Sequence, residues 1–455
     1  MISLRKKSFF MTGSLLVAVW LLVAQVMGNT ILLIPCLVCF MALVLLASVN
    51  KMLIPVLMFF LPWAPLIKIT PGTTSVYTVA LLLALMICVV LWGRNINAVH
   101  IVPALLLMAS ALIIKLAYGY SINNDFIVFS VFLFALPFLS GENGGEYGFY
   151  ELTVFFSLGI VLAALSAQQL NTFPTISRFI EVITLHDQIR LSGYYGDPNF
   201  YSAHITTAMA GIMILVLKEK QLKKRLFLLS ILVLLTYSGF ISVSKSFALV
   251  AVCILIFWIM QLLFQKEKLS VKVMLFLTII IGVLFVLFST VFSDLIEMML
   301  NRLFTSGTNI SAFTTGRVEI WKSYLEKLSD NTLLLLFGIG CTNELINGRT
   351  AHNSLIQCVY QLGISGTVMF LAWFMCFLST MLGQRKLNFS HLMQTAILIV
   401  GSIGPWFALD MMFFDEFFLV PFFVLVGIRY ITESENSALG DNIKTDLTAK
   451  YIKQI

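Results

Sequence analysis

The chain has 455 residues, of which 59% are hydrophobic and 11% are charged, and its formal net charge is +7. A soluble globular domain carries roughly 25% charged residues, so this composition excludes a water-soluble fold. Apolar runs of about 20 residues recur along the chain, and each is long enough to cross a hydrocarbon core. Backbone groups in lipid must be hydrogen-bonded within the protein, so we predict an all-α polytopic membrane protein. The basic residues lie largely in short turns, as the positive-inside rule expects, and we predict no nucleic-acid partner.

The first part of the chain predicts seven apolar helices. Arg5-Lys6-Lys7 precede the first run, 8–28, which we interpret as an uncleaved helix with a cytoplasmic N-terminus. The run at 52–68 contains three prolines, so we expect it to be kinked and partly re-entrant. The other runs lie at 30–48, 76–93, 100–118, 126–140 and 149–167.

Residues 168–199 form a polar segment that the count of spans places outside the membrane. It carries apolar and titratable residues at helical spacing, namely Phe179, Val182, Ile183 and His186. Glycines and Asp197-Pro198 then predict a turn. We expect Asn199 to cap the helix that follows.

The second part of the chain predicts further spans around one large polar loop. A lysine-rich cluster at 218–225 is the strongest cytoplasmic marker. The count gives about 14 transmembrane helices (range 11–14), with both termini cytoplasmic. The predicted organisation is transmembrane helices over 1–291, an external loop over 292–354, transmembrane helices over 355–430 and a cytoplasmic tail over 431–455.

Within the large loop, Arg317 opens a segment whose apolar positions, Val318, Trp321, Leu325 and Leu328, predict an amphipathic helix. The helix dipole disfavours a cation in the first turn, so Arg317 is either an ordinary surface arginine or part of an anion site beside free N–H groups. His352, where the loop meets the next apolar run, is either a satisfied polar or interfacial residue, or a general base or oxyanion partner.

The count places Arg190, Lys245, Arg317 and His352 on the same external side. Taken singly, Lys245 is explained as a snorkelling lysine and Arg190 as a solvated arginine. Together they run against the positive-inside trend and favour an anionic ligand, such as a membrane lipid with a diphosphate head. Three acids in the last external turn either lie in solvent, pair with basic neighbours or bind a metal: Asp410, Asp415 and Glu416. We predict no metal site.

The order of the polar motifs resembles that of the O-antigen ligase and O-antigen polymerase superfamily of bacterial envelope glycan assembly. The resemblance covers roughly residues 185–370 by motif and the rest by topology. The motifs are Arg190-x-x-Gly193, Asp197-Pro198-Asn199, Ser244-Lys245-Ser246, Gly316-Arg317-x-x-x-Trp321, Gly338-x-Gly340, His352-Asn353-Ser354 and Gly363-Ile364-x-Gly366.

This resemblance implies a GT-C-like glycosyltransferase of the bacterial cytoplasmic membrane, with an external active site and neither metal nor other cofactor. The implied donor is a glycan on undecaprenyl diphosphate, transferred with inversion. His352 and Arg317 would be catalytic. The implied substrate-binding residues are Arg190, Lys245, Arg317, Arg349 and Asn353. The family commonly has arginine where this chain has Lys245, so that position departs from the pattern.

Three functions fit these observations. The favoured one is a polymerase that joins lipid-linked repeat units into O-antigen, capsule or exopolysaccharide. The second is a ligase that moves a finished glycan to lipid A core or another acceptor. The third is a flippase or other transporter of lipid-linked oligosaccharide, which should show internal pseudosymmetry and charged residues within spans. Expected partners are the lipid-linked glycan, membrane lipids, a chain-length regulator and a flippase.

Overall fold

The chain is seen here in a computed structural model that is almost entirely helical. It describes residues 2–70, 75–92, 98–140, 147–180, 183–185, 188–190, 192–264, 314, 316–342, 344–382 and 388–432, with Ser293, Glu297 and Leu300. The predicted span 273–291, most of 292–315 and the tail from 433 onward lie outside the described residues. The all-α polytopic fold class is confirmed for the part of the chain that is described.

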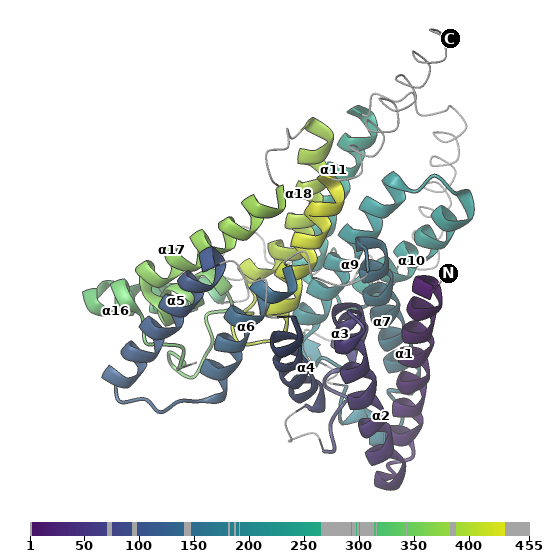
Figure 1. Cartoon of the computed structure of the whole chain (residues 1–455), viewed down its shortest axis with the longest axis horizontal. Coiled ribbons are helices and arrows are strands. Elements are labelled where there is room, and N and C mark those ends of the chain that lie inside the picture. The colour runs from purple at the N-terminus through teal and green to yellow at the C-terminus, as the bar shows by residue number, and fades with distance from the viewer. Residues whose placement is uncertain are drawn as a thin grey trace.

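Among the described residues, nine helices are long and apolar enough to cross a membrane. They are α1 (Ile2–Val26), α2 (Thr30–Val49), α5 (Ala98–Ala117), α7 (Phe149–Leu170), α9 (Pro198–Lys218), α10 (Leu222–Ile241), α11 (Lys245–Phe264), α17 (Ser354–Leu382) and α18 (Phe389–Ile403), whose span continues to Ala408. Shorter helices are α3 (Leu53–Phe60), η1 (Leu61–Trp63), α4 (Val76–Trp92) and α6 (Asn124–Ser140), and η3 (Gly404–Ala408) leads to a last helix over 416–432. In Figure 1, α5, α16 and α17 lie together on the left, and α1 and α2 run side by side at the lower right.

The proline-rich run is broken, as predicted. Its first part forms α3 and then η1, and every residue from 53 to 63 is buried. Trp63 Nε1 donates to the carbonyl of Gly159 in α7 at 3.0 Å. A Cβ on Gly159 would lie 2.1 Å from the Phe59 carbonyl oxygen, so only glycine lets α3 pack this closely on α7.

Helix ends meet at two ends of the bundle. At one end, Ser244 before α11 hydrogen-bonds Asn199 in the first turn of α9, and Ser354 of α17 hydrogen-bonds Leu409. At the other, Lys218 Nζ of α9 donates to the Ile431 carbonyl oxygen at 3.0 Å. We call the first end the site face; it is formed by residues 192–199, 242–247, 316–324, 349–354 and 407–415. The count of spans from the sequence also put these segments on one common side of the membrane. Which side that is stays a prediction.

One predicted helix is wrong. The segment after Phe179 contains an antiparallel hairpin of β1 (Ile183–Leu185) and β2 (Gln188–Arg190), with Ile183 opposite Arg190. Before it, α8 (Pro174–Ser177) is a single helical turn. The β-branched residues of the hairpin favour extended backbone, which outweighs the helical spacing. Val182 and His186 lie outside the described residues.

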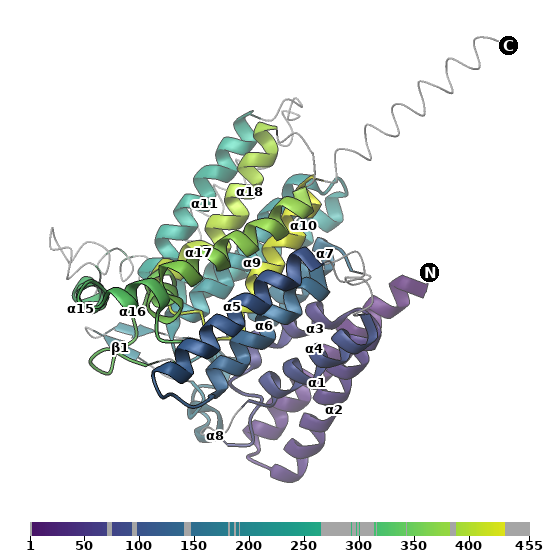
Figure 2. The same cartoon turned by 60° about the vertical axis from the view of Figure 1, so that its left-hand side comes forward.

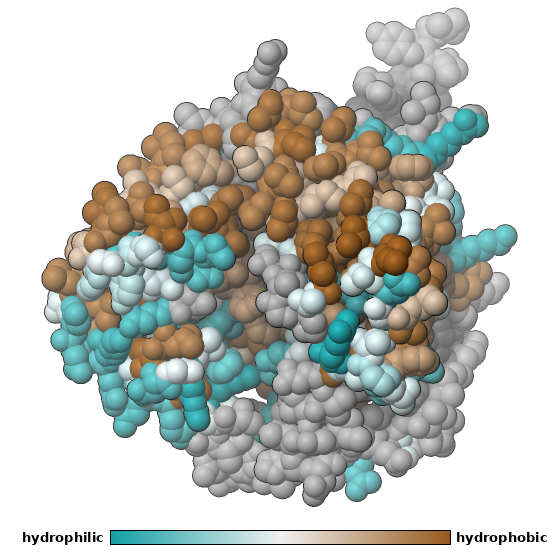
Figure 3. Space-filling view, turned by 90° about the horizontal axis from the view of Figure 1, so that it is seen from below, coloured by the Kyte–Doolittle hydropathy of each residue, from teal (hydrophilic) through white to brown (hydrophobic). Residues whose placement is uncertain are grey.

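The described part of the large loop contains α15 (Arg317–Ser329) and α16 (Thr332–Phe337), which Figure 2 shows beside the outer part of α17. The predicted apolar face of α15 is shifted, because Leu325 is 56% exposed while Tyr324 and Leu328 are buried. These two residues form a small separate core with Leu334 of α16 and Tyr360 of α17. Figure 3, which looks at the molecule from below, shows hydrophilic side chains gathered at its left edge and hydrophobic ones above them.

The end of α16 is inserted between two membrane helices. α17 is kinked at Gly363 (φ 69°), and the carbonyls of Tyr360 and Gln361 accept the N–H groups of Ile339 (3.2 Å) and Gly340 (2.9 Å). A Cβ on Gly340 would lie 2.5 Å from the Ala111 carbonyl oxygen of α5. The prediction that 292–354 lies outside the membrane stays a prediction for this segment. Because glycine has no side chain, the two backbones come close enough to form these hydrogen bonds. The carbonyl groups that the kink in α17 leaves without helical partners are thereby satisfied.

Candidate functional site

A single carboxylate holds the backbone of the segment that carries His352. Asp410 Oδ2 accepts the His352 N–H at 2.8 Å, and Oδ1 accepts the Asn353 N–H at 3.1 Å. Asp410 is 8% exposed, so both bonds are shielded from water. His352 has a φ of 48°, a left-handed conformation that non-glycine residues rarely adopt. The surrounding contacts hold the strained residue in place, as is common at functional sites.

The two residues after His352 join α17 to the 407–411 segment. Asn353 Oδ1 accepts the N–H groups of Leu355 and Ile356, and its Nδ2 donates to the Phe407 carbonyl at 3.2 Å. Ser354 Oγ donates to the Leu409 carbonyl at 2.6 Å. The Asn353 amide therefore caps α17, and its predicted contact with substrate stays a prediction.

The spacing of Arg317 and Trp321 places both residues on one side of α15. Trp321 Nε1 donates to the Ala351 carbonyl at 2.9 Å, and Tyr324 hydroxyl donates to the Arg349 carbonyl at 2.9 Å. The first two turns of α15 are thereby fixed to the backbone on either side of Thr350. This attachment holds Arg317 beside the His352 segment.

The Asp-Pro-Asn and Ser-Lys-Ser motifs meet at the site face. Asp197 Oδ1 accepts the N–H of Asn199 at 2.7 Å and caps α9, so the prediction that Asn199 is the cap is wrong. Asn199 Oδ1 instead accepts the Ser244 hydroxyl at 2.9 Å, which fixes the start of α11. Lys245 is the first residue of α11 and is half-buried. It therefore begins its helix directly beside the turn that carries Asp197.

Burial, together with two carboxylates and two guanidinium groups, sets the charge of His352. Burial lowers the pKa of Arg317, while Asp197 and Asp410 raise it, and an arginine stays charged at neutral pH. Burial also lowers the pKa of His352 below its usual 6.5. The carboxylates of Asp410 and Asp197 oppose this shift, whereas Arg317 and Arg349 add to it. The imidazole is consequently neutral at pH 7 and able to accept a proton.

The structure brings Arg317, Arg349 and His352 within electrostatic reach of one another. Lys245 follows Ser244, which hydrogen-bonds Asn199 in the first turn of α9, and its placement beside the other three stays a prediction. The Arg349 side chain is exposed at the rim. Arg190 ends strand β2, two residues before Ser192, but its side chain lies outside the described residues.

Sequence reasoning missed the separate roles of the three acids before the last helix. Asp410 holds the His352 segment, Asp415 accepts the Thr78 hydroxyl at 3.0 Å, and Glu416 is fully buried. Glu416 Oε1 accepts the Tyr195 hydroxyl and lies 2.9 Å from His204 Nε2. The sequence does contain a signal for these roles. Acids at the start of an apolar helix are poorly solvated, so they need partners within the protein. In the described part of the chain, no group of three or more His, Cys, Asp or Glu side chains is arranged to hold a metal.

Four helices begin at the site face, namely α9, α11, α15 and α17. Their N-termini carry partial positive charge and add to the side-chain cations. A ligand with two phosphate groups would be attracted by the cationic side chains there. The first N–H groups of α9 and α17 are already accepted by Asp197 and Asn353. A neutral imidazole beside such a ligand has the chemistry of a general base.

No protein-family model matches the chain, and a search of curated proteins gives no match. Function is therefore inferred from the side chains at the site face and from the order of the motifs.

Proposed function

We propose that the chain is a membrane glycosyltransferase that polymerises oligosaccharide repeat units carried on undecaprenyl diphosphate. One observation carries the proposal: Asp410 holds the backbone of His352 and also faces the guanidinium of Arg317. The same carboxylate thus positions the proposed base and lies close enough to the proposed anion-binding cation to raise its pKa. The proposal includes the GT-C-like arrangement of about 14 helices, a bacterial cytoplasmic membrane, cytoplasmic termini and an external site.

The proposed reaction is a direct displacement at the anomeric carbon of the donor. The acceptor oxygen forms the new bond, the bond to the diphosphate oxygen breaks, and the configuration inverts. The proton of the acceptor hydroxyl passes to the neutral His352 imidazole. Arg317 and Lys245 stabilise the charge that develops on the leaving diphosphate. The diphosphate leaves as an anion, so the site needs positive charge more than a proton donor.

The test replaces Arg317 or His352 with Ala and separates the cell's lipid-linked glycans on a gel. We expect single repeat units to accumulate on the carrier. Lys322→Ala is the matched control, because Lys322 lies on the same helix with its side chain 75% exposed. Long chains left on the carrier would indicate the ligase instead, which shares the donor site. Normal, fully transferred glycan in both variants would overturn the assigned site.

A transporter is the second candidate, favoured by one observation. His204 and Glu416 form an ionisable pair in which neither side chain is more than 1% exposed. Such pairs within membrane helices often line ion or substrate paths. The discriminating measurement uses wild-type protein in vesicles. Movement of a lipid-linked oligosaccharide across the bilayer without chain growth would favour the transporter, particularly if Glu416→Gln stops that movement.

A further inference from the structure

We infer that Tyr195 and Glu416 are positioning residues for the turn that carries Asp197. They hold this turn at the site that contains His352, and the effect of this on turnover rests on the proposed function. Glu416 lies at the start of the last helix and is fully buried. Its Oε1 accepts the hydroxyl of Tyr195. One side-chain hydrogen bond therefore joins the last helix to the turn.

The acceptor of this bond is fixed from a second side. His204 Nε2 of α9 lies 2.9 Å from Glu416 Oε1, and neither side chain is more than 1% exposed. The His204 ring also packs edge-on against Tyr195, at 4.8 Å between the ring centroids. Among the described residues, the other titratable groups near Glu416 are Tyr77 of α4 and Asp415. A buried acceptor with two partners gives the Tyr195 hydroxyl one defined position.

The position of Tyr195 sets that of Asp197, because the backbone between them is closed by hydrogen bonds. Only Gly196 separates the two residues. The Asp197 N–H donates to the Tyr195 carbonyl at 2.8 Å, and the Tyr195 N–H donates to the Ser192 carbonyl at 3.2 Å. Gly196 has a φ of 72°, which glycine adopts without a steric cost. A movement of the Tyr195 backbone therefore moves Asp197 as well.

The place of Asp197 matters because its carboxylate acts on His352. This carboxylate raises the pKa of the imidazole against the effect of burial. Other charged groups act on the same imidazole, namely Asp410, Arg317 and Arg349. The interaction between two charges weakens with distance, so a turn that moves away from His352 raises its pKa less. Loss of the bond between Tyr195 and Glu416 should therefore lower the pKa of His352.

The test measures the pKa of His352 from the pH dependence of its reaction with diethyl pyrocarbonate, which modifies the neutral imidazole. The full chain is used in detergent, and mass spectrometry quantifies the peptide that contains His352. Tyr195→Phe removes the hydroxyl and keeps the ring that stacks on Phe200 at 6.0 Å. The midpoint of the reaction should move to lower pH, as in Asp197→Asn. Added to Asp197→Asn, the Tyr195→Phe substitution should cause no further shift.

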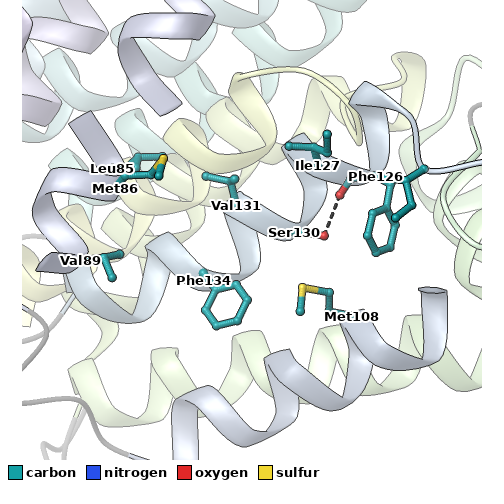
Figure 4. Close-up of a pocket in the computed structure, with 10 residues that line it drawn as sticks. Leu85, Met86, Val89, Met108, Phe126, Ile127, Ser130, Val131 and Phe134 are labelled. Atoms are coloured by element: carbon teal, nitrogen blue, oxygen red, sulfur yellow. Dashed lines mark hydrogen bonds between the residues drawn. The ribbon is translucent and has the colours of Figure 1, made fainter. Parts of the chain in front are cut away.

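Two control variants each remove a hydroxyl group elsewhere. Tyr77→Phe loses the hydrogen bond from a fully buried tyrosine to the Leu57 carbonyl at 2.9 Å. Ser130→Ala loses the hydrogen bond to the Phe126 carbonyl at 2.7 Å, which Figure 4 shows within α6. Neither control should change the midpoint of His352. A shift of the same size in Tyr77→Phe would mean that general destabilisation moves the midpoint, and would overturn the inference.

A conservative variant and the turnover complete the test. Glu416→Gln keeps an oxygen that can accept the Tyr195 hydroxyl, so its midpoint should stay at the wild-type value. Tyr195→Phe should lower turnover about two- to tenfold, the worth of one hydrogen bond, without raising the donor KM. A midpoint shifted by Tyr195→Phe in a protein that makes no polymer would support the positioning role and refute only the proposed function. An unshifted midpoint would overturn the positioning role, whether or not the wild type makes polymer.

Discussion

Asp410 Oδ2 lies 2.8 Å from the backbone nitrogen of His352, and the same carboxylate also accepts the next N–H along the chain. A charged acceptor with two oxygens is well suited to two adjacent N–H groups in a buried turn. This pairing keeps His352 in its left-handed conformation next to Arg317. The acid acts on the site through the backbone, which makes it a positioning residue.

Asp410→Asn should lower turnover by about one to two orders of magnitude. In this variant one of the two backbone N–H groups faces an amide N–H₂ and has no acceptor, which costs about 1–3 kcal/mol. The donor KM should change less, since Arg317 and Lys245 remain. The measurement is the initial rate of chain growth on a lipid-linked repeat unit. Glu326→Gln is the control, as Glu326 is exposed on α15. Wild-type turnover in Asp410→Asn would contradict the positioning role.

The pH dependence should follow His352. Its pKa in the folded protein lies below 6.5, so activity should fall as pH drops through a midpoint below that value. The same sign applies to stability: the contribution of neutral His352 is present above 6.5 and is lost as pH falls through the lowered pKa. Arg349→Gln removes a cation that lowers this pKa, so the acid midpoint should move up. Asp197→Asn should move it down, and identical midpoints in all three proteins would refute the assignment.

The glycine at 340 should tolerate no side chain. Gly340→Ala places a Cβ about 2.5 Å from backbone atoms of α5 and also strains a residue with a φ of 79°. Gly348→Ala is the matched control, because Gly348 has a φ of 68° but no atom within 4 Å of the added Cβ. The control should lose about 1–2 kcal/mol from the left-handed backbone alone. Thermal unfolding in detergent should show a clearly larger loss for Gly340→Ala.

The elements that depend on local pattern were predictable from the sequence. Continuous apolar runs indicate the membrane helices, and the count of spans grouped Lys245, Arg317 and His352 on one side. The partners of these residues depend on distant segments. Asp410 is 58 positions from His352, and Glu416 is 212 positions from His204. Neither pairing leaves a periodic signal.

The errors have the same origin. Asn199 has the residue type of a helix cap, yet Ser244 occupies its side-chain oxygen and Asp197 supplies the cap. The packing of the glycine turn at 338–340 was not predictable, because it depends on the kink at Gly363 in another helix. Local propensity gives way in both places to hydrogen bonds that form only when the helices pack.

Substitutions of Lys245 test whether the positive charge at this position takes part in the proposed reaction. Lys245→Arg should keep most of the activity, since the positive charge beside the Asp197 turn remains. Lys245→Gln should raise the donor KM about tenfold, the loss of one charge-assisted contact to phosphate. Lys223→Gln, on an exposed position at the other end of α10, is the control. Equal donor KM in Lys245→Gln and wild type would remove Lys245 from the site.

Removing one partner of the buried pair of His204 and Glu416 should strongly destabilise the protein. Glu416→Ala leaves His204 and the Tyr195 hydroxyl without their acceptor in a fully buried place, a loss of about 3–5 kcal/mol. Replacing both partners by apolar residues, His204→Phe with Glu416→Leu, should recover much of that loss, because no buried charge is then unpaired. Thermal unfolding in detergent measures both. Glu326→Ala, which breaks the exposed pair with Lys322, should cost less than about 1 kcal/mol. A loss for Glu416→Ala no larger than for Glu326→Ala would mean that the pair does not stabilise the bundle.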